Sequence, residues 1–182
     1  MQQEPLHKLV IRDAKLADMV AVQALYAHYV LNELATFELV PPSLDEMCAR
    51  RQAILDCGLP YLVAELAGEI VGYAYAANYR PRPAYRYTVE DSVYLSPQHT
   101  GLGIGTALLS EVIRRCELGP WRQMVAVIAQ TGGTGSAALH GKLGFVEVGN
   151  MPNVGYKFNR WLGTLIMQRE LGEGAKSAPA PI

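Results

Sequence analysis

Three glycines at alternate positions, Gly101, Gly103 and Gly105, follow a short turn and lead directly into a helical pattern. Just ahead of them, residues 88–95 (TVEDSVYL) read as a strand. A strand that feeds a glycine-rich turn and then a helix can bind an anion, because backbone N–H groups of the turn and the helix N-terminus point at it. The chemistry that this spacing predicts is binding of a phosphate or diphosphate.

Two other phosphate-binding motifs fit the same stretch less well. A P-loop needs Lys and then Ser or Thr after its last glycine, whereas Gly105 is followed by Thr106 and Ala107. A dinucleotide fingerprint needs G-x-G-x-x-G and an acidic residue about 20 residues further on. Here the last glycine spacing differs, and Trp121 and Arg122 occupy that region. A glycine-rich turn before an ordinary helix is the alternative without a ligand.

Two adjacent carboxylates, Glu90 and Asp91, interrupt the strand before the glycines. A carboxylate beside a pocket can take the proton of an attacking nucleophile, and partial burial raises its pKa toward a useful range. Strand alternation places the two side chains on opposite faces, so we expect only one of them to face the pocket. The residues alone do not decide between the two, and a solvated Glu at a strand edge is the alternative without function.

The loop before this strand is basic and aromatic, with Arg80, Arg82, Tyr85 and Arg86 within seven positions. Guanidinium groups match a carboxylate with two parallel hydrogen bonds. The cluster therefore favours binding of a carboxylate-bearing substrate, and a solvated basic loop is the alternative.

The elements that must position these residues follow one another as strand, two helices, three strands, helix, strand, helix and a strand pair. The continuous apolar run at residues 124–129 indicates a buried strand parallel to residues 88–95. Ser43 and Glu46 form a capping-box pattern at the start of the second helix. This order predicts an α/β fold with a mixed, mostly antiparallel sheet, a central parallel strand pair and flanking helices. Strands are expected at residues 8–13, 61–66, 70–79, 88–95, 124–129, 145–148 and 162–170, and helices at residues 18–29, 44–57, 106–118 and 136–143.

Length and composition limit the other possibilities. The 182 residues suit a single domain, expected at residues 1–171, and half of them are hydrophobic. Residues 172–182 are rich in Ala, Gly and Pro and are expected to form a disordered tail. A formal net charge of −1 argues against general nucleic-acid binding.

Targeting signals and cysteine usage point to a cytoplasmic protein. The N-terminal residues lack the apolar core of a signal peptide, and no apolar run reaches about 18 residues, so no membrane span is expected. Cys48, Cys57 and Cys116 are odd in number and show neither metal-site nor CxxC spacing. We expect them to be reduced thiols that pack in the interior, and we expect no metal.

Two motifs resemble the GNAT acetyltransferases. Residues 99–109 (HTGLGIGTALL) are similar to the acetyl-coenzyme A (acetyl-CoA) loop of that family, written Q/R-x-x-G-x-G/A, with Thr100 at the Gln/Arg place. Residues 139–145 (LHGKLGF) resemble its short helix that runs into a Gly-Phe turn. The order of elements resembles the GNAT fold over nearly the whole chain. The resemblance implies acetyl-CoA as cosubstrate, bound by Gly101, Leu102, Gly103, Ile104, Gly105, Thr106, Gly133 and Lys142, with the backbone of Val93, Tyr94 and Leu95 along its pantetheine arm.

Two longer segments, residues 79–97 and 151–171, resemble the phosphinothricin and methionine sulfoximine acetyltransferase branch. Two departures are Gly163, where relatives have Asp, and Gly133, where relatives have Asn. The branch implies direct acetyl transfer to the amine of a small amino-acid-like substrate and a homodimer whose last hairpin helps to wall the pocket. It also implies roles for single residues: Glu90 as general base; His140 near the thioester, as proton donor to the thiolate or only as a hydrogen-bonding group; and Arg80, Arg82, Tyr85, Arg86 and Phe37 around the substrate.

Two alternatives stay open at this point. One is an acetyltransferase for another amine, such as a polyamine or a protein N-terminus, although the arginine loop would repel a polycation. The other is a non-catalytic module that senses acyl-CoA.

Overall fold

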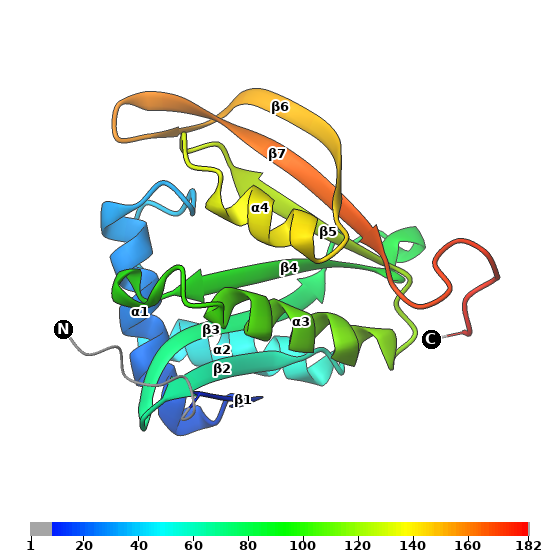
Figure 1. Cartoon of the computed structure of the whole chain (residues 1–182), viewed down its shortest axis with the longest axis horizontal. Helices are drawn as coiled ribbons and strands as arrows, with labels where there is room; N and C mark the ends of the chain where they lie inside the picture. The colour runs from blue at the N-terminus through cyan, green and yellow to red at the C-terminus, as the bar shows by residue number, and fades with distance from the viewer. Residues whose placement is uncertain (1–8, 182) are drawn as a thin grey trace.

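A computed structural model describes residues 9–181, so Lys8, predicted to begin the first strand, lies outside the described residues. Within them, seven strands form one sheet in the order β1-β2-β3-β4-β5-β7-β6 (Figure 1). Neighbours pair antiparallel except β4 and β5, which are parallel. The mixed sheet with a central parallel pair confirms the predicted fold class. The strands are β1 (Leu9–Asp13), β2 (Tyr61–Leu66), β3 (Glu69–Asn78), β4 (Thr88–Leu95), β5 (Gln123–Ala129), β6 (Val146–Lys157) and β7 (Arg160–Glu170).

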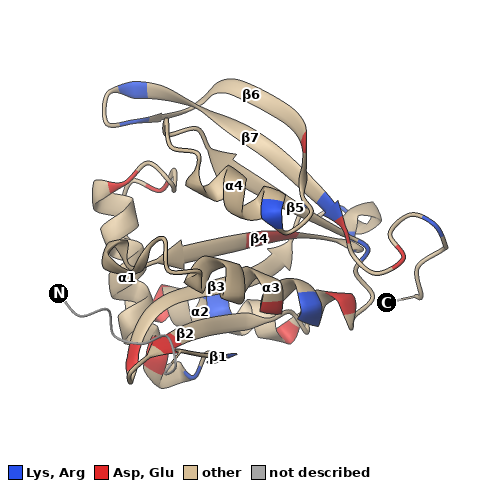
Figure 2. Cartoon of the chain, in the orientation of Figure 1, with Lys and Arg blue, Asp and Glu red and all other residues tan. Residues whose placement is uncertain are grey.

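The helices cover both faces of the sheet. One face packs α1 (Met19–Asn32) and α2 (Leu44–Asp56), and the other packs α3 (Ile104–Glu117) and α4 (Gly135–Lys142) (Figure 1). Each face therefore has its own buried core: Met19 and Tyr73 lie in the first and Leu108 and Met124 in the second. Figure 2 shows basic and acidic segments interspersed along the fold, in agreement with the small net charge.

The start of α2 follows its sequence signal only in part. Ser43 is the predicted N-cap, and its hydroxyl accepts the Glu46 N–H at 3.1 Å. The reciprocal half of the capping box was expected from the Glu46 carboxylate, which instead accepts a hydrogen bond from Arg50 Nε at 3.1 Å. A strong cation one turn further along the helix competes successfully for that carboxylate.

The last hairpin is longer than predicted. β6 runs to Lys157, because register irregularities between Glu147 and Gly149 and between Met151 and Gly155 absorb the residues that read as a loop. A two-residue turn at positions 158–159, both with positive φ, then leads into β7.

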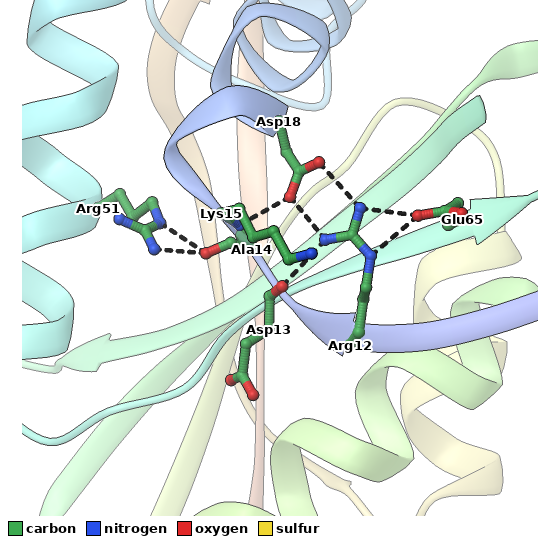
Figure 3. A network of polar contacts seen from close by, with 7 residues as sticks. All are labelled: Arg12, Asp13, Ala14, Lys15, Asp18, Arg51 and Glu65. Atoms are coloured by element: carbon green, nitrogen blue, oxygen red, sulfur yellow. Dashed lines mark hydrogen bonds and ion pairs between the residues drawn. The ribbon is translucent and has the colours of Figure 1, made fainter. Parts of the chain in front are cut away.

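A polar cluster holds the edge strand β1 in place (Figure 3). Arg12 donates hydrogen bonds to Asp18, ahead of α1, and to Glu65 on β2, each at 2.7 Å. Arg51 of α2 donates to the carbonyl oxygen of Ala14. These contacts join the edge of the sheet to both helices of one face.

The three cysteines are free thiols in different surroundings. Cys116 is buried, and burial raises its pKa to about 12, as expected of a packing thiol. Cys48 is half-buried and Cys57 is exposed, so the expectation of interior packing is wrong for Cys57.

Two further expectations concern the membrane and the tail. No helix in the described part of the chain is long and apolar enough to cross a bilayer. Residues 172–181 contain neither helix nor strand, and Arg122 donates hydrogen bonds to the Ser177 hydroxyl and the Ala178 carbonyl.

The parallel pair at the centre of the sheet is short. β4 and β5 pair only from Thr88–Gln123 to Glu90–Val125, although both strands continue beyond that point. β3 stays paired with β4 as far as Leu95, and β7 stays paired with β5 as far as Ala129. The two halves of the sheet therefore separate after Glu90, and the backbone of residues 91–95 loses its neighbour on one side.

Candidate active site

A cavity of about 750 Å³ occupies the opening between β4 and β5. Its volume suits a small ligand or a cofactor. It is bordered by the separated parts of the two strands, the glycine turn before α3, and α4. Many of the residues selected from the sequence meet on its walls: Phe37, Glu90, Val93, Tyr94, Leu95, Gly101, Gly103, Gly105, Thr106, Gly133, His140 and Lys142.

The glycine turn presents backbone donors at one end of the cavity. Gly101 and Gly103 have φ of 76° and 82°, a region that glycine adopts without steric cost. The first bond of α3 runs from the Ala107 N–H to the Gly103 carbonyl at 3.0 Å. The N–H groups at positions 104–106 precede that bond and have no acceptor within the helix, so they are available to an anion.

Two neighbouring side chains, those of Leu102 and Ile104, take no part in the cavity wall. Ile104 is fully buried in the core, and Leu102 is exposed to solvent. Both can contribute only their main-chain groups to a ligand. Thr100, at the place of the usual Gln or Arg, does line the cavity. Its hydroxyl donates a hydrogen bond to the Pro97 carbonyl at 3.2 Å and thus stabilises the turn itself.

Glu90 and Asp91 both line the cavity, so the expectation that only one of them could face it is wrong. The two side chains do lie on opposite faces of β4: Val93 packs in the core under α3, and Tyr94 packs in the core under α1. Because β5 has separated from β4 here, the opening passes through the sheet and reaches both faces. Glu90 borders it from the α1 side and Asp91 from the α3 side.

The Glu90 carboxyl group is half-buried on the face that α1 and α2 cover. Burial raises its pKa above the ordinary value of 4.5, the charge of Asp91 raises it further, and the charge of Arg80 opposes both. A carboxylate whose pKa is raised in a cavity has the property that a general base needs.

His140 and Asp91 form a buried pair on the opposite face. His140 Nε2 lies 2.9 Å from Asp91 Oδ2, and His140 Nδ1 lies 2.7 Å from the Ser136 carbonyl oxygen. A carboxylate and a carbonyl are both acceptors, so this geometry favours a hydrogen on each ring nitrogen. Burial by itself lowers the pKa of His140, but the hydrogen bond and charge of Asp91 and the Ser136 carbonyl outweigh it and raise the pKa above 6.5.

The sequence does not reveal this pair. Asp91 and His140 are 49 positions apart, and the sequence singles out Asp91 only as the alternative to Glu90. Asp91 Oδ1 is buried without a hydrogen-bond partner among the described residues. Thr164 of β7, which no sequence motif indicates, also lines the cavity, and its hydroxyl is buried without a hydrogen-bond partner among the described residues.

The basic loop lies beside the cavity and forms no part of its wall. Arg80, Arg82, Tyr85 and Arg86 are exposed and absent from the lining residues. Arg80 lies 4.7 Å from the centroid of the Tyr79 ring, which itself packs edge-on against Tyr85. Of the four, only Arg80 influences the pKa of Glu90.

Two exposed residues complete the set that was predicted to bind acetyl-CoA. Gly133, in the loop before α4, and Lys142, in the last turn of α4, border the cavity on the side of the glycine turn. Among residues 9–181, no three His, Cys, Asp or Glu side chains gather in a way that could hold a metal ion.

Comparisons with known proteins agree with this architecture. Residues 23–145 match the acetyltransferase (GNAT) family. The chain is 51% identical over 170 residues to a phosphinothricin N-acetyltransferase of Alcaligenes faecalis, an alignment that covers 93% of this chain and 85% of the relative. It is 41% identical over 174 residues to an L-methionine sulfoximine/L-methionine sulfone acetyltransferase of Pseudomonas aeruginosa, covering 93% and 98%. The crystal structure of a phosphinothricin acetyltransferase from Sinorhizobium meliloti in complex with acetyl-CoA superposes with a TM-score of 0.91 at 48% identity, covering 95% and 94%.

Proposed function

The chain belongs to the GNAT family of acetyltransferases, in the phosphinothricin and methionine sulfoximine acetyltransferase branch, and we propose that it acetylates the α-amine of a small amino-acid-like acceptor such as phosphinothricin, methionine sulfoximine or methionine sulfone. It is an acetyl-CoA-dependent N-acetyltransferase. The observation that carries the proposal is the opening between β4 and β5, which has free backbone donors at one end and the Glu90 carboxylate on its wall.

The glycine turn and β4 supply the groups that acetyl-CoA would need. The diphosphate would accept hydrogen bonds from the N–H groups of residues 101–106, helped by the positive end of the α3 dipole. The pantetheine arm would take the place that β5 leaves beside Val93, Tyr94 and Leu95, as an extended ligand added to a strand edge. Lys142 and Gly133 border the same route.

Glu90 is the proposed general base. The acceptor amine gives a proton to Glu90, directly or through water, and its lone pair attacks the acetyl carbonyl carbon. The tetrahedral intermediate then expels the thiolate of coenzyme A and leaves the amide. Transfer is direct, so no covalent enzyme intermediate forms.

His140 has a different role in this proposal. Both of its ring nitrogens are already in hydrogen-bond contact, Nε2 with the Asp91 carboxylate and Nδ1 with the Ser136 carbonyl. We therefore assign it a positioning role at the cofactor side of the cavity, and the departing thiolate takes its proton from water.

The basic loop and Phe37 would select the acceptor. Arg80, Arg82, Tyr85 and Arg86 would bind the carboxylate and polar side group of the acceptor at the mouth of the cavity, with the loop closing onto the bound molecule. Phe37 lines the cavity and would border the acceptor side chain.

Strand β6 supports the proposal of a homodimer. It is the outermost strand of the sheet, and nearly its whole length is exposed. An apolar edge strand of this kind is unfavourable in water unless another chain covers it. The exposed apolar residues of the hairpin are Val146, Val148, Met151, Val154, Tyr156, Phe158 and Trp161.

The test is release of free thiol from acetyl-CoA in the presence of a panel of amines. Phosphinothricin, methionine sulfoximine and methionine sulfone should give saturable turnover, and spermidine and a peptide N-terminus should give little. Preference for spermidine or the peptide would indicate an acetyltransferase for another class of amine. Saturable acetyl-CoA binding with no turnover on any amine would favour the sensor.

A further inference from the structure

Phe37 stands in the loop between α1 and α2 and is held there from both sides. Tyr26 OH donates a hydrogen bond to the Glu38 carboxylate at 2.8 Å and lies 2.9 Å from the hydroxyl of Thr36. Arg50 also donates to Glu38, at 2.6 Å. The residues before and after Phe37 are therefore fixed to α1 and α2, while its ring reaches the cavity.

The end of β6 reaches the same loop through a buried ammonium group. Lys157 is 2% exposed, and its Nζ donates to the carbonyl oxygens of Thr36 at 2.9 Å and of Tyr29 at 3.5 Å. Tyr29 lies in the last turn of α1, where carbonyl groups favour a cation. Burial lowers the pKa of Lys157 below 10.5, although the charges of Glu33 and Glu38 oppose this. No step of the proposed reaction uses this lysine, yet it connects the hairpin to the loop that carries Phe37.

Gly155, two residues earlier on β6, lies directly under the Phe37 ring. A Cβ atom at Gly155 would lie 2.4 Å from Phe37 Cε2 and 2.6 Å from Cδ2. Distances this short are impossible, so any side chain at this position must displace the ring. The backbone of Gly155 is outside the positive-φ region, so alanine fits the backbone, and the three atoms nearest to its Cβ all belong to the Phe37 ring.

We propose that Gly155 and Lys157 are positioning residues for acceptor selectivity, which hold the Phe37 ring at the depth that sets the size of the acceptor side chain. This inference rests on the proposed function. Phe37 enters the cavity from the α1 side, the face to which Glu90 also points, whereas the glycine turn lies at α3. Displacement of the ring should therefore change binding of the acceptor and leave binding of acetyl-CoA unchanged.

The test is a double-mutant cycle on steady-state kinetics with phosphinothricin and methionine sulfoximine. Gly155→Ala should raise the KM for the acceptor about tenfold and keep the KM for acetyl-CoA within about twofold. In a Phe37→Ala background, Gly155→Ala should have no further effect, because the ring that it displaces is gone. Lys157→Met, which keeps the aliphatic stem and removes the donors, should also raise only the acceptor KM.

Gly149→Ala is the matched control on the same strand, since its Cβ would meet Ile166 at an ordinary 4.0 Å. Three results would each overturn the proposal. The effects of Gly155→Ala and Phe37→Ala could be additive, Gly155→Ala could raise the KM for acetyl-CoA as much as the KM for the acceptor, or Gly155→Ala could leave the kinetics unchanged. If the Gly155→Ala variant does not fold, the Gly155→Ala/Phe37→Ala double variant decides. A folded double variant supports the proposal, and an unfolded one overturns it. Absence of wild-type turnover on the whole panel removes the proposed function, and with it this inference; wild-type turnover with an unaffected Gly155→Ala variant removes the inference alone.

Discussion

The imidazole Nε2 of His140 lies 2.9 Å from the carboxylate Oδ2 of Asp91, and both side chains are buried. The pair joins α4 to β4 at the first position of β4 that no longer pairs with β5. A polar link between a helix and a strand thus spans the place where the sheet opens. Asp91 therefore joins α4 to β4 beside the cavity, and Glu90, the proposed base, lies on the other face of the strand.

Asp91→Asn should destabilise the fold in a pH-dependent way. The folded-state pKa of His140 is raised above 6.5, so its contribution to stability is fully present below about pH 6.5 and is lost as the pH rises through the folded-state pKa. Loss of one partner of a buried ion pair costs about 3 kcal/mol. Urea unfolding at pH 6 should show that loss, and unfolding at pH 9 should show a smaller one. The control is Glu69→Gln, which changes an exposed carboxylate on β3. An equal loss of unfolding free energy for Asp91→Asn at both pH values would contradict the ion pair.

Glu90→Gln should lower kcat by a factor of about 10² to 10⁴, because the amide keeps the shape of the carboxylate and cannot accept the proton of the amine. The KM for acetyl-CoA should change little, since the glycine turn is untouched. Rapid-quench measurement of acetylated product separates loss of chemistry from slow product release. A Glu90→Gln enzyme with wild-type turnover would falsify the assignment of the base.

Arg80→Ala should move the acid limb of the kcat/KM profile to higher pH. The charge of Arg80 lowers the pKa of Glu90 against the effects of burial and Asp91, so its removal raises that pKa further. At a given acidic pH, a larger fraction of Glu90 is then protonated and inactive as a base. Arg114→Ala, on the exposed end of α3, is the control and should leave the midpoint unchanged. A shift to lower pH for Arg80→Ala would contradict this electrostatic coupling.

Local sequence signals predict the elements that carry the site. The glycine spacing predicts a turn and a helix start, and the structure has positive φ at Gly101 and Gly103 followed by α3. Alternation predicts that Glu90 and Asp91 lie on opposite faces of one strand, and they do. These features are determined by residues that are close together in the chain, so a short stretch of sequence is enough to predict them.

The remaining features depend on distant residues. The separation of β4 from β5 is set by pairing across the whole sheet, so the sequence could not show that both carboxylates reach one cavity. The contact of Lys157 with Thr36 spans 121 positions. Residues 149–157 contain glycine, proline and asparagine that read as a loop, and only pairing with β7 keeps them extended.

Gly103→Ala should weaken acetyl-CoA binding, and Gly68→Ala, a variant with a similar cost in stability, should not. Both Gly103 and Gly68 have positive φ and open space where a Cβ would be placed, so alanine should cost each about 1 kcal/mol of unfolding free energy. Gly68 lies in the β2–β3 turn, away from the cavity. Only Gly103→Ala should raise the KM for acetyl-CoA, by about tenfold, because it disturbs the donors of the turn. If both variants raise the KM for acetyl-CoA equally, the proposal that the glycine turn binds the diphosphate is wrong.

Trp161→Glu should convert a dimer into a monomer. Trp161 is 63% exposed on β7 and lies 5.2 Å, between ring centroids, from Tyr156 on β6. Exposed aromatic residues on an edge hairpin favour burial against another chain, and a carboxylate there would be desolvated without a partner. Sedimentation velocity should show a wild-type dimer and a folded monomeric variant with an unchanged circular dichroism spectrum. Leu118→Glu at the end of α3, where the leucine is 77% exposed, is the control and should remain a dimer. A monomeric wild type, or dissociation by both substitutions, would show that the exposed hairpin serves some purpose other than pairing two copies of the chain.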